Sequence, residues 1–263
     1  MLHLTAIHFT KAELDLIPAD HRLAYFGICQ IADETAILLR TAISAINSGG
    51  PADPAYVRDM SNATALLATR LLAGRLFEAR QFINSREVAV AFRELSGLAA
   101  QHDQRVGPSL ERARVGRAAL FRLINASRLI GPLRNRAAFH AEMGLIEEAY
   151  DQLPVGMNFV DYIGSTRGNS IFGGAESLHL TALSALVGQG DVPDFDRALA
   201  QTVREVGEAV GYLGDFTEGF VSAFIVAHLG VERLQGDRIA VPSAVPIDEL
   251  RLPLFSTHPR EPS

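Results

Sequence analysis

The spacing of apolar residues over long uninterrupted segments is the feature that most constrains this fold. In residues 20–47 apolar side chains recur every three to four positions, and the Ser-Gly-Gly-Pro sequence at 48–51 ends the run. This pattern predicts an amphipathic α-helix with one buried face. Runs of alternating β-branched residues joined by hairpin turns, which would predict strands, are few or absent. The chain is therefore expected to be all-α.

Similar patterns predict further helices along the chain. One is expected to begin near Ser61, a favourable N-cap residue, and another at Ser109. Gly131 and Pro132 break the latter helix and start the next, which extends to about Tyr150. The remaining predicted helices cover residues 86–101, 176–187, 194–212 and 216–235. We predict an up-and-down helical bundle with additional C-terminal helices.

No internal repeat and no clear boundary divides the 263 residues. We expect residues 1–150 to form the helical bundle. Residues 151–239 are expected to add a Gly-rich loop and further helices that pack on the same domain. Residues 240–263 contain five prolines, which predicts an extended tail that is ordered only where it docks on another surface.

The composition indicates a soluble, globular chain with a substantial core, because 48% of its residues are hydrophobic and 21% are charged. We expect the protein to be cytoplasmic because the sequence suggests neither a signal peptide nor a membrane span. The single cysteine, Cys29, excludes an intramolecular disulfide and a Cys-rich zinc site, and no Cys- or Ser-hydrolase motif accompanies it. No signal peptide is expected. No membrane association is expected either, because the most apolar later stretch, residues 220–230, is too short to span a bilayer.

Positive charge is concentrated in one window. The net charge of −6 argues against a protein that coats nucleic acid in general, yet residues 105–136 contain eight arginines and a single acidic residue, Glu111. Lys11 is the only lysine, so genome composition explains the choice of arginine but not the scarcity of acidic residues in this window. We expect the window to attract anions.

The window ends in the sequence PLRNRAAFHAE at residues 132–142, which carries chemistry suited to a phosphodiester. Arg134 can hold a phosphate through two hydrogen bonds, and His140 can take or give a proton near neutral pH. Residues six apart on a helix differ by about 240° and rise about 9 Å, so these two do not share a face, whereas Arg136 and His140 do. Taken alone, the Arg-x5-His spacing arises by chance in many proteins, and a packing role for His140 is the more common explanation.

The sequence LRNRAAFHAE resembles the signature of the HEPN superfamily, all-α domains in which Arg, often followed by Asn, precedes His by four to six residues. The resemblance is sharp over about ten residues, softer over residues 61–150, and absent from the last hundred. It implies that Arg134 binds the scissile phosphate, Asn135 orients the site and His140 acts as the acid–base residue. The Ala-Glu pair after His140 departs from the aromatic or polar residue and Asp that members often have.

Active HEPN members are metal-independent ribonucleases whose composite site lies at a dimer interface, and they often serve as toxins or in phage defence. The resemblance therefore implies a homodimer with RNA or a nucleotide as its ligand, no metal or other cofactor, and a neutralising protein partner. Other members are inactive and serve in binding or assembly, which is the alternative function for this chain.

Several arginines in the window are candidate RNA-backbone ligands beside Arg136. Arg114, Arg117 and Arg128 lie at related angles if one helix carries them, with Arg112 and Arg122 nearby in sequence. A surface of this kind would make RNA binding strongly dependent on salt. An ordinary solvated helix face is an equally good explanation of the pattern.

Two further motifs are weaker. Glu176 and His179 have the Glu-x-x-His spacing of di-metal bundles, but no second copy of the motif is found, so an exposed helix start with an incidental histidine is the favoured interpretation. The Gly-rich residues 164–174 match no nucleotide-binding fingerprint. An interhelical loop is favoured there, although Arg167 and the loop amides could hold a phosphate.

Overall fold

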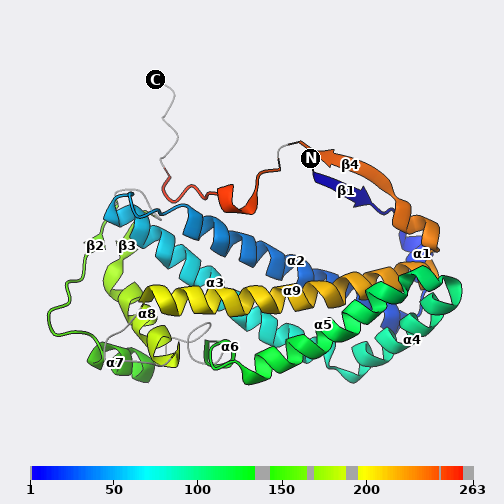
Figure 1. Ribbon diagram of the computed structural model, residues 1–263, viewed down its shortest axis with the longest axis horizontal. Coiled ribbons are helices and arrows are strands. Elements are labelled where there is room, and N and C mark those ends of the chain that lie inside the picture. The colour runs from blue at the N-terminus through cyan, green and yellow to red at the C-terminus, as the bar shows by residue number, and fades with distance from the viewer. Residues whose placement is uncertain (1, 134–142, 165–168, 188–194, 243, 257–263) are drawn as a thin grey trace. The chain divides into compact units, whose positions relative to one another are not determined.

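The computed structural model describes residues 2–133, 143–164, 169–187, 195–242 and 244–256 (Figure 1). The all-α prediction is confirmed. Long helices make up most of this part of the chain: α2 (Ala19–Asn47), α3 (Ala55–Ile83), α4 (Arg86–His102), α5 (Gly107–Ala126), α8 (Gly173–Val187) and α9 (Phe195–His228). Shorter α-helices are α1 (Lys11–Asp15), α6 (Ile130–Pro132) and α7 (Met143–Asp151).

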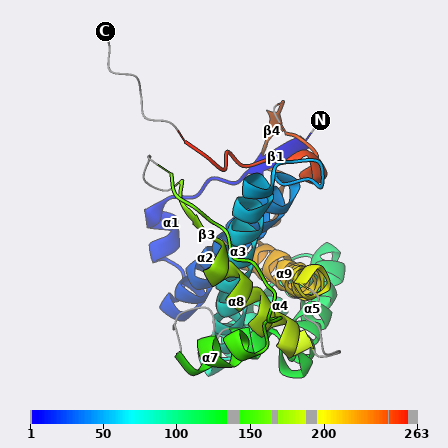
Figure 2. The same cartoon turned by 90° about the vertical axis from the view of Figure 1, so that its left-hand side faces the viewer.

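The strands in the described residues are short and form two antiparallel ribbons. β1 (Leu2–Ala6) pairs with β4 (Asp237–Val241), and β2 (Asp161–Tyr162) pairs with β3 (Ile171–Phe172). Figure 2 shows β1 beside β4. In this ribbon Leu4 is paired with Ile239, and both side chains are about half exposed. The ribbon therefore adds little to the buried core.

The chain folds into two compact units, which are described separately. Unit 1 consists of Met1–Ala36, Arg75–Ala126 and Gly207–Ala244, and unit 2 consists of Ile37–Gly74, Ser127–Val206 and Val245–Ser263. Helices α2, α3 and α9 each contribute one part to unit 1 and the other part to unit 2.

Aromatic packing forms the centre of unit 1. Phe92 of α4 contacts two rings of α9, Phe216 at 5.1 Å and Phe220 at 6.0 Å between centroids. One helical turn further along α9, Phe224 stacks on Tyr25 of α2 at 4.1 Å. All three α9 phenylalanines are fully buried. Their spacing of four residues places them on one face of α9, and this face organises the core of the unit.

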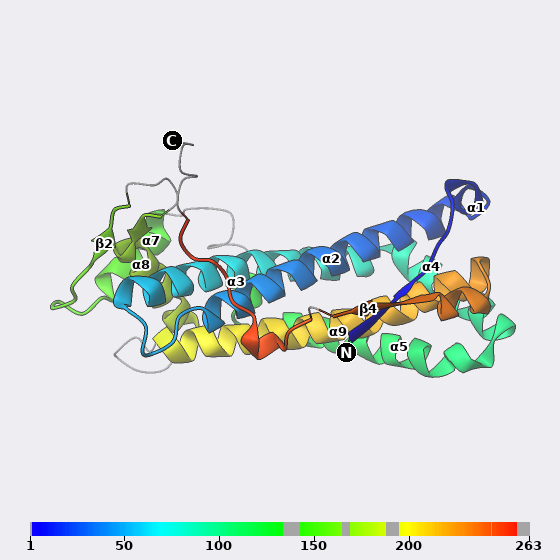
Figure 3. The same cartoon turned by 90° about the horizontal axis from the view of Figure 1, so that it is seen from above.

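Glycines allow α5 and α9 to approach closely in unit 1 (Figure 3). A Cβ atom at Gly219 would lie 2.6 Å from the carbonyl oxygen of Ser109, and one at Gly116 would lie 2.8 Å from that of Tyr212. Contacts this short cannot be accommodated without moving backbone. Both glycines therefore determine how near the two helix axes lie.

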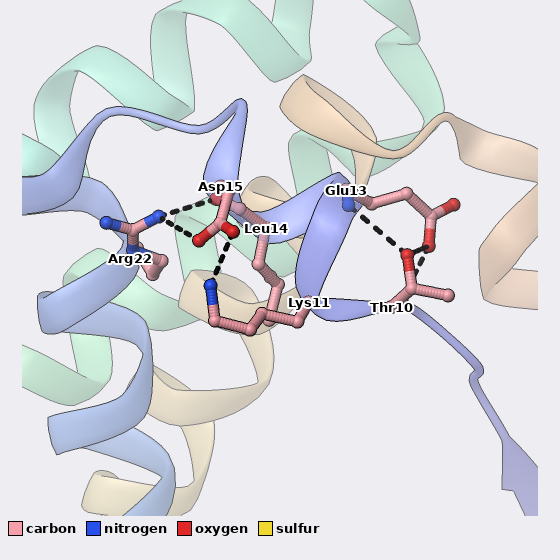
Figure 4. Close-up of polar contacts among 6 residues, drawn as sticks. All are labelled: Thr10, Lys11, Glu13, Leu14, Asp15 and Arg22. Carbon is pink, nitrogen blue, oxygen red and sulfur yellow. Dashed lines mark hydrogen bonds and ion pairs between the residues drawn. The ribbon is translucent and has the colours of Figure 1, made fainter.

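The entry into α2 is held by a capped short helix. Thr10 and Glu13 form a reciprocal capping box at the start of α1 (Figure 4). Arg22 of α2 donates hydrogen bonds to the carbonyl oxygen of Leu14, at 2.9 Å, and to Asp15, at 3.3 Å. These contacts anchor α1 to the first turns of α2.

In unit 2 the C-terminal part of α2 packs against the N-terminal part of α3. Ser61, which was expected to cap α3, is a buried residue inside the helix, and its hydroxyl donates to the carbonyl oxygen of Ala45 at 2.6 Å. The prediction of its role was wrong because a serine hydroxyl can equally join two packed helices. Ser109 was likewise expected as a cap but lies inside α5, where its hydroxyl donates to the carbonyl oxygen of Val106.

The tail docks on unit 2. Asn47 donates to the carbonyl oxygen of Ile247 at 2.9 Å, and the backbone amide of Leu252 donates to the Ser48 hydroxyl. Further along, the amide of Ser256 donates to Asn169 at 3.1 Å. The polar end of α2 thus supplies the surface on which this Pro-rich segment is ordered.

Helix α9 replaces two predicted helices. Residues 194–212 and 216–235 were expected to be separate, but Phe195–His228 form one helix. Gly214 lies within it and costs only about 1 kcal/mol of helix propensity relative to alanine. Burial of the phenylalanine face outweighs that cost.

Among the described helices α9 contains the one segment, Leu199–His228, that is long and apolar enough to cross a membrane by length and composition. Half of the apolar stretch within this segment is buried inside the protein. The fully buried phenylalanines Phe216, Phe220 and Phe224 account for much of its apolar character as core packing.

Candidate functional site

The Arg-Asn-x4-His motif lies outside the described residues. Arg134, Asn135, Arg136 and His140 all fall between Leu133, where one described segment ends, and Met143, where the next begins. Their assigned roles remain predictions from the sequence.

The segment that leads into the motif is anchored in unit 2. The Ser127 hydroxyl accepts hydrogen bonds from the backbone amides of Leu129 and Ile130, and it donates to Glu205 of α9 at 2.7 Å. Leu129, Ile130 and Leu133 are buried. The chain therefore enters the motif from a fixed point in the core.

Two predicted phosphate-binding arginines of α5 already have partners. Arg114 forms an ion pair with Glu111 at 3.3 Å, and both side chains are more than half exposed. Arg117 is half-buried and lies 5.5 Å from the centre of the Phe121 ring. Burial lowers the pKa of Arg117, and its Nε has no hydrogen-bond partner within the described residues. Arg114 can exchange its exposed partner for a phosphate, whereas Arg117 is committed to packing.

The exposed cations nearest the motif in sequence are Arg122 and Arg128. Arg122 donates to the carbonyl oxygen of Ala118 in its own helix. Neither arginine has a carboxylate partner in the part of the chain that the structure describes. By contrast, Arg112 pairs with Glu218 at 2.6 Å. Among the described residues, Arg122 thus joins Arg128 as an exposed cation without a carboxylate partner.

The Glu176-x-x-His179 pair lies at the start of a helix, as the sequence predicted, but it is not exposed. Both residues lie in the first half of α8 and are half-buried. Burial raises the pKa of Glu176 although the nearby Arg70 opposes this, and one buried Glu176 carboxylate oxygen has no hydrogen-bond partner among the residues that the structure describes. The predicted helix start is therefore present, and only its expected exposure was wrong, because this turn of α8 lies near Arg70 of α3 in unit 2.

Glu176 lines a pocket of about 170 Å³ in unit 2. Polar and apolar groups share its wall: Asp59 and Asn62 of α3, Asn158, Phe159, Val160, Ile171, Gly173, Glu176, Ser177 and Leu180. The two carboxylates can accept hydrogen bonds and the two side-chain amides can accept and donate them, so the pocket suits a small polar molecule. Asp59, Asn62 and Asn158 could not be predicted as pocket residues, because no short motif joins residues about a hundred positions apart.

The Gly-rich loop contributes to the same region of unit 2. Ile171 lines the pocket, and the Gly164 amide donates to the Ser170 hydroxyl at 3.1 Å. A Cβ atom at Gly173 would lie 2.4 Å from the carbonyl oxygen of Val160, so a glycine is required there. Arg167, the possible phosphate ligand, lies outside the described residues.

His179 is expected to make stability depend on pH. Burial, with Arg70 nearby, lowers the pKa of His179 from 6.5 to about 4. A base whose pKa is lower in the folded state contributes its full stability above the unfolded pKa and loses it as pH falls. The unfolding free energy should therefore fall between about pH 6.5 and 4, by at most about 3 kcal/mol from this group.

Urea denaturation at pH 7 and pH 4.5 measures this loss in the wild type and in His179→Gln. The variant should lose less stability, whereas His102→Gln, which removes an exposed histidine of α4, should behave as wild type. Glu176 opposes the effect in both proteins because its pKa is raised. Equal losses in wild type and His179→Gln would contradict the prediction.

Comparison with known protein families, curated proteins and solved structures found no match to this chain.

Proposed function

We propose that this chain is a ribonuclease that cleaves RNA without a metal ion, with Arg134 and His140 as its principal groups. The observation that carries the proposal is the sequence LRNRAAFHAE at the end of a window with eight arginines and one acidic residue. The all-α fold agrees with it, as does the exposure of Arg122 and Arg128 without carboxylate partners in the described residues.

The chemistry needs a base, an acid and a cation. His140 removes the proton from a ribose 2′-OH, whose oxygen attacks the adjacent phosphorus. The bond from phosphorus to the 5′ oxygen breaks, and the His140 of a second chain protonates that leaving oxygen. Arg134 holds the phosphate and balances the negative charge that develops on its oxygens. The products are a 2′,3′-cyclic phosphate and a 5′-OH.

Two copies of the motif across a dimer axis supply both proton-transfer groups, so we propose that the active form is a homodimer. An enzyme of this kind damages the RNA of its own cell unless it is restrained. This fits a toxin or phage-defence role with a neutralising protein partner.

The direct test incubates purified protein with single-stranded RNA in EDTA and analyses the ends of the products. The proposal expects cleavage with cyclic phosphate and 5′-OH ends, and loss of cleavage in Arg134→Ala. RNA binding without cleavage by wild type would favour the alternative, a non-catalytic module of the same fold that binds RNA or a nucleotide. Absence of both binding and cleavage would reject the proposal.

Arg122 and Arg128 are expected to contribute to RNA binding through the phosphate backbone. Each neutralised phosphate contributes about 0.7 to the slope of log affinity against log salt for a single strand. Arg122→Ala and Arg128→Ala should each weaken binding at low salt and reduce the slope by about that amount. Fluorescence anisotropy in a His140→Ala background measures this without cleavage.

The matched control is Arg40→Ala, which removes an exposed arginine from α2. It should leave both the affinity and the slope unchanged. A loss of affinity equal to that of Arg122→Ala would show that the α5 arginine has no special role.

A further inference from the structure

Unit 1 contains a cluster of ligand-type side chains that the proposed ribonuclease chemistry does not use. It joins Asp20 and His21 from the first turn of α2 to Glu94 of α4. One ligand atom from each residue lies within 4.8 Å of the other two. Within the cluster, Nε2 of His21 lies 3.1 Å from Oε2 of Glu94.

We propose that Asp20, His21 and Glu94 form a binding site for a divalent transition-metal ion, with zinc as the best match. Zinc takes imidazole nitrogen and carboxylate oxygen at about 2.0–2.2 Å. Two ligands at that bond length lie roughly 3–3.5 Å apart across a shared ion. Nε2 of His21 and Oε2 of Glu94, which share a hydrogen bond of 3.1 Å in the structure, already have this spacing. The third ligand atom, a carboxylate oxygen of the exposed Asp20, lies within 4.8 Å of both of these atoms.

The accessibility of the three residues suits an open metal site. His21 is 4% exposed, so its imidazole is held by packing. Asp20 and Glu94 are exposed, so an ion can enter from solvent, and coordination positions remain for water or another ligand. Three protein ligands with an open position are the arrangement that catalytic zinc sites use.

His228 supplies an independent second contact to the buried ligand. Its Nε2 lies 3.0 Å from Nδ1 of His21, the ring nitrogen that faces away from Glu94. Metal-bound histidines almost always donate their other N–H to an acceptor, which determines the tautomer and the ring orientation. The Nε2 atom of a neutral imidazole can accept that hydrogen bond, and its position beside Nδ1 of His21 suits this role.

A metal ion on His21 fixes the position of the one proton that its neutral ring carries. With the ion on Nε2 of His21, the remaining ring proton resides on Nδ1 and is donated to Nε2 of His228. His228 is therefore a positioning residue, and the ligands are Asp20, His21 and Glu94. The site binds metal independently of the RNA motif, whose proposed chemistry proceeds in EDTA.

The experiment is calorimetric titration of Zn²⁺ into the full chain after removal of metal with a chelator. We expect one ion per chain in the wild type and at least about 10-fold weaker binding in Glu94→Gln, which keeps the size of an exposed side chain. Loss of the positioning residue in His228→Gln should weaken binding by about 10- to 100-fold. Glu87→Gln, an exposed carboxylate at the start of the same helix α4, should bind as wild type.

Cobalt provides a readout that does not depend on affinity alone. Co²⁺ bound through His21 should give visible absorption bands that disappear in His21→Ala, with circular dichroism verifying that the variant is folded. If His21→Ala is unfolded, Glu94→Gln decides the question. Zinc binding that is absent in the wild type, or unchanged in Glu94→Gln, overturns the proposal, whether or not RNA is cleaved.

Discussion

Replacing His140 with alanine is expected to reduce the rate of RNA cleavage by about 10²- to 10⁴-fold, the usual contribution of a positioned acid–base group. In a composite dimer site the substitution removes both proton-transfer groups at once, which places the effect toward the upper end. RNA affinity should change little, because the arginines and not the imidazole carry the phosphate contacts. Single-turnover cleavage in EDTA, together with anisotropy for binding, separates the two quantities.

Specificity of this effect is tested with a second histidine. His102→Ala removes an exposed side chain at the end of α4 and should cleave RNA as wild type does. Arg134→Ala should reduce both cleavage and affinity, because it contacts the phosphate before and during the reaction. If wild type cleaves RNA and His140→Ala retains that rate, His140 has a packing role and the assignment fails.

Replacing Phe220 with alanine is expected to lower the free energy of unfolding by about 3–5 kcal/mol, as for other buried phenylalanines. Phe220 is fully buried in α9 and contacts Phe92 of α4. Removing the ring loses its hydrophobic burial and leaves a cavity that α9 cannot fill. Small domains are stabilised by only about 5–15 kcal/mol in total, so the loss is a large fraction.

Urea denaturation followed by circular dichroism measures this change. The matched control is Phe26→Ala on α2, whose ring is 46% exposed and lies at the edge of the same unit. It should cost much less, within about 1 kcal/mol, because most of the ring already contacts water. A cost for Phe220→Ala no greater than that of Phe26→Ala would mean that the aromatic face of α9 does not form the core.

Local sequence features predicted several helices well. The apolar spacing of residues 20–47 and the Gly-Gly-Pro that follows correspond to α2, Ala19–Asn47, and the 86–101 prediction corresponds to α4, Arg86–His102. Both helix predictions depend on interactions between residues close in sequence. A helix that packs on a core needs one apolar face, and it ends where glycine and proline disfavour the helical backbone. These signals act within a few residues and can be seen without tertiary contacts.

Helix boundaries were predicted less well where tertiary contacts compete with local signals. Ser61 has the side chain of an N-cap but bonds to Ala45 of a neighbouring helix. Gly214 looks like a helix break but is accommodated because the phenylalanine face of α9 is buried as a unit. A capping hydroxyl or an interior glycine changes helix stability by only about 1 kcal/mol. Burial of several aromatic rings contributes more than this to the free energy of folding.

The sequence by itself determined the helical class of the protein and contains the motif at Arg134 and His140. Both can be recognised because helical periodicity and the motif depend on residues that are close together in the sequence. Only the tertiary structure decided which residues meet: Glu176 with Asp59 in a pocket of unit 2, and His21 with Glu94 and His228 in unit 1. His21 and His228 are separated by 207 positions. Their contact follows from the side-chain packing that brings the ends of α2 and α9 together, and no local spacing encodes it.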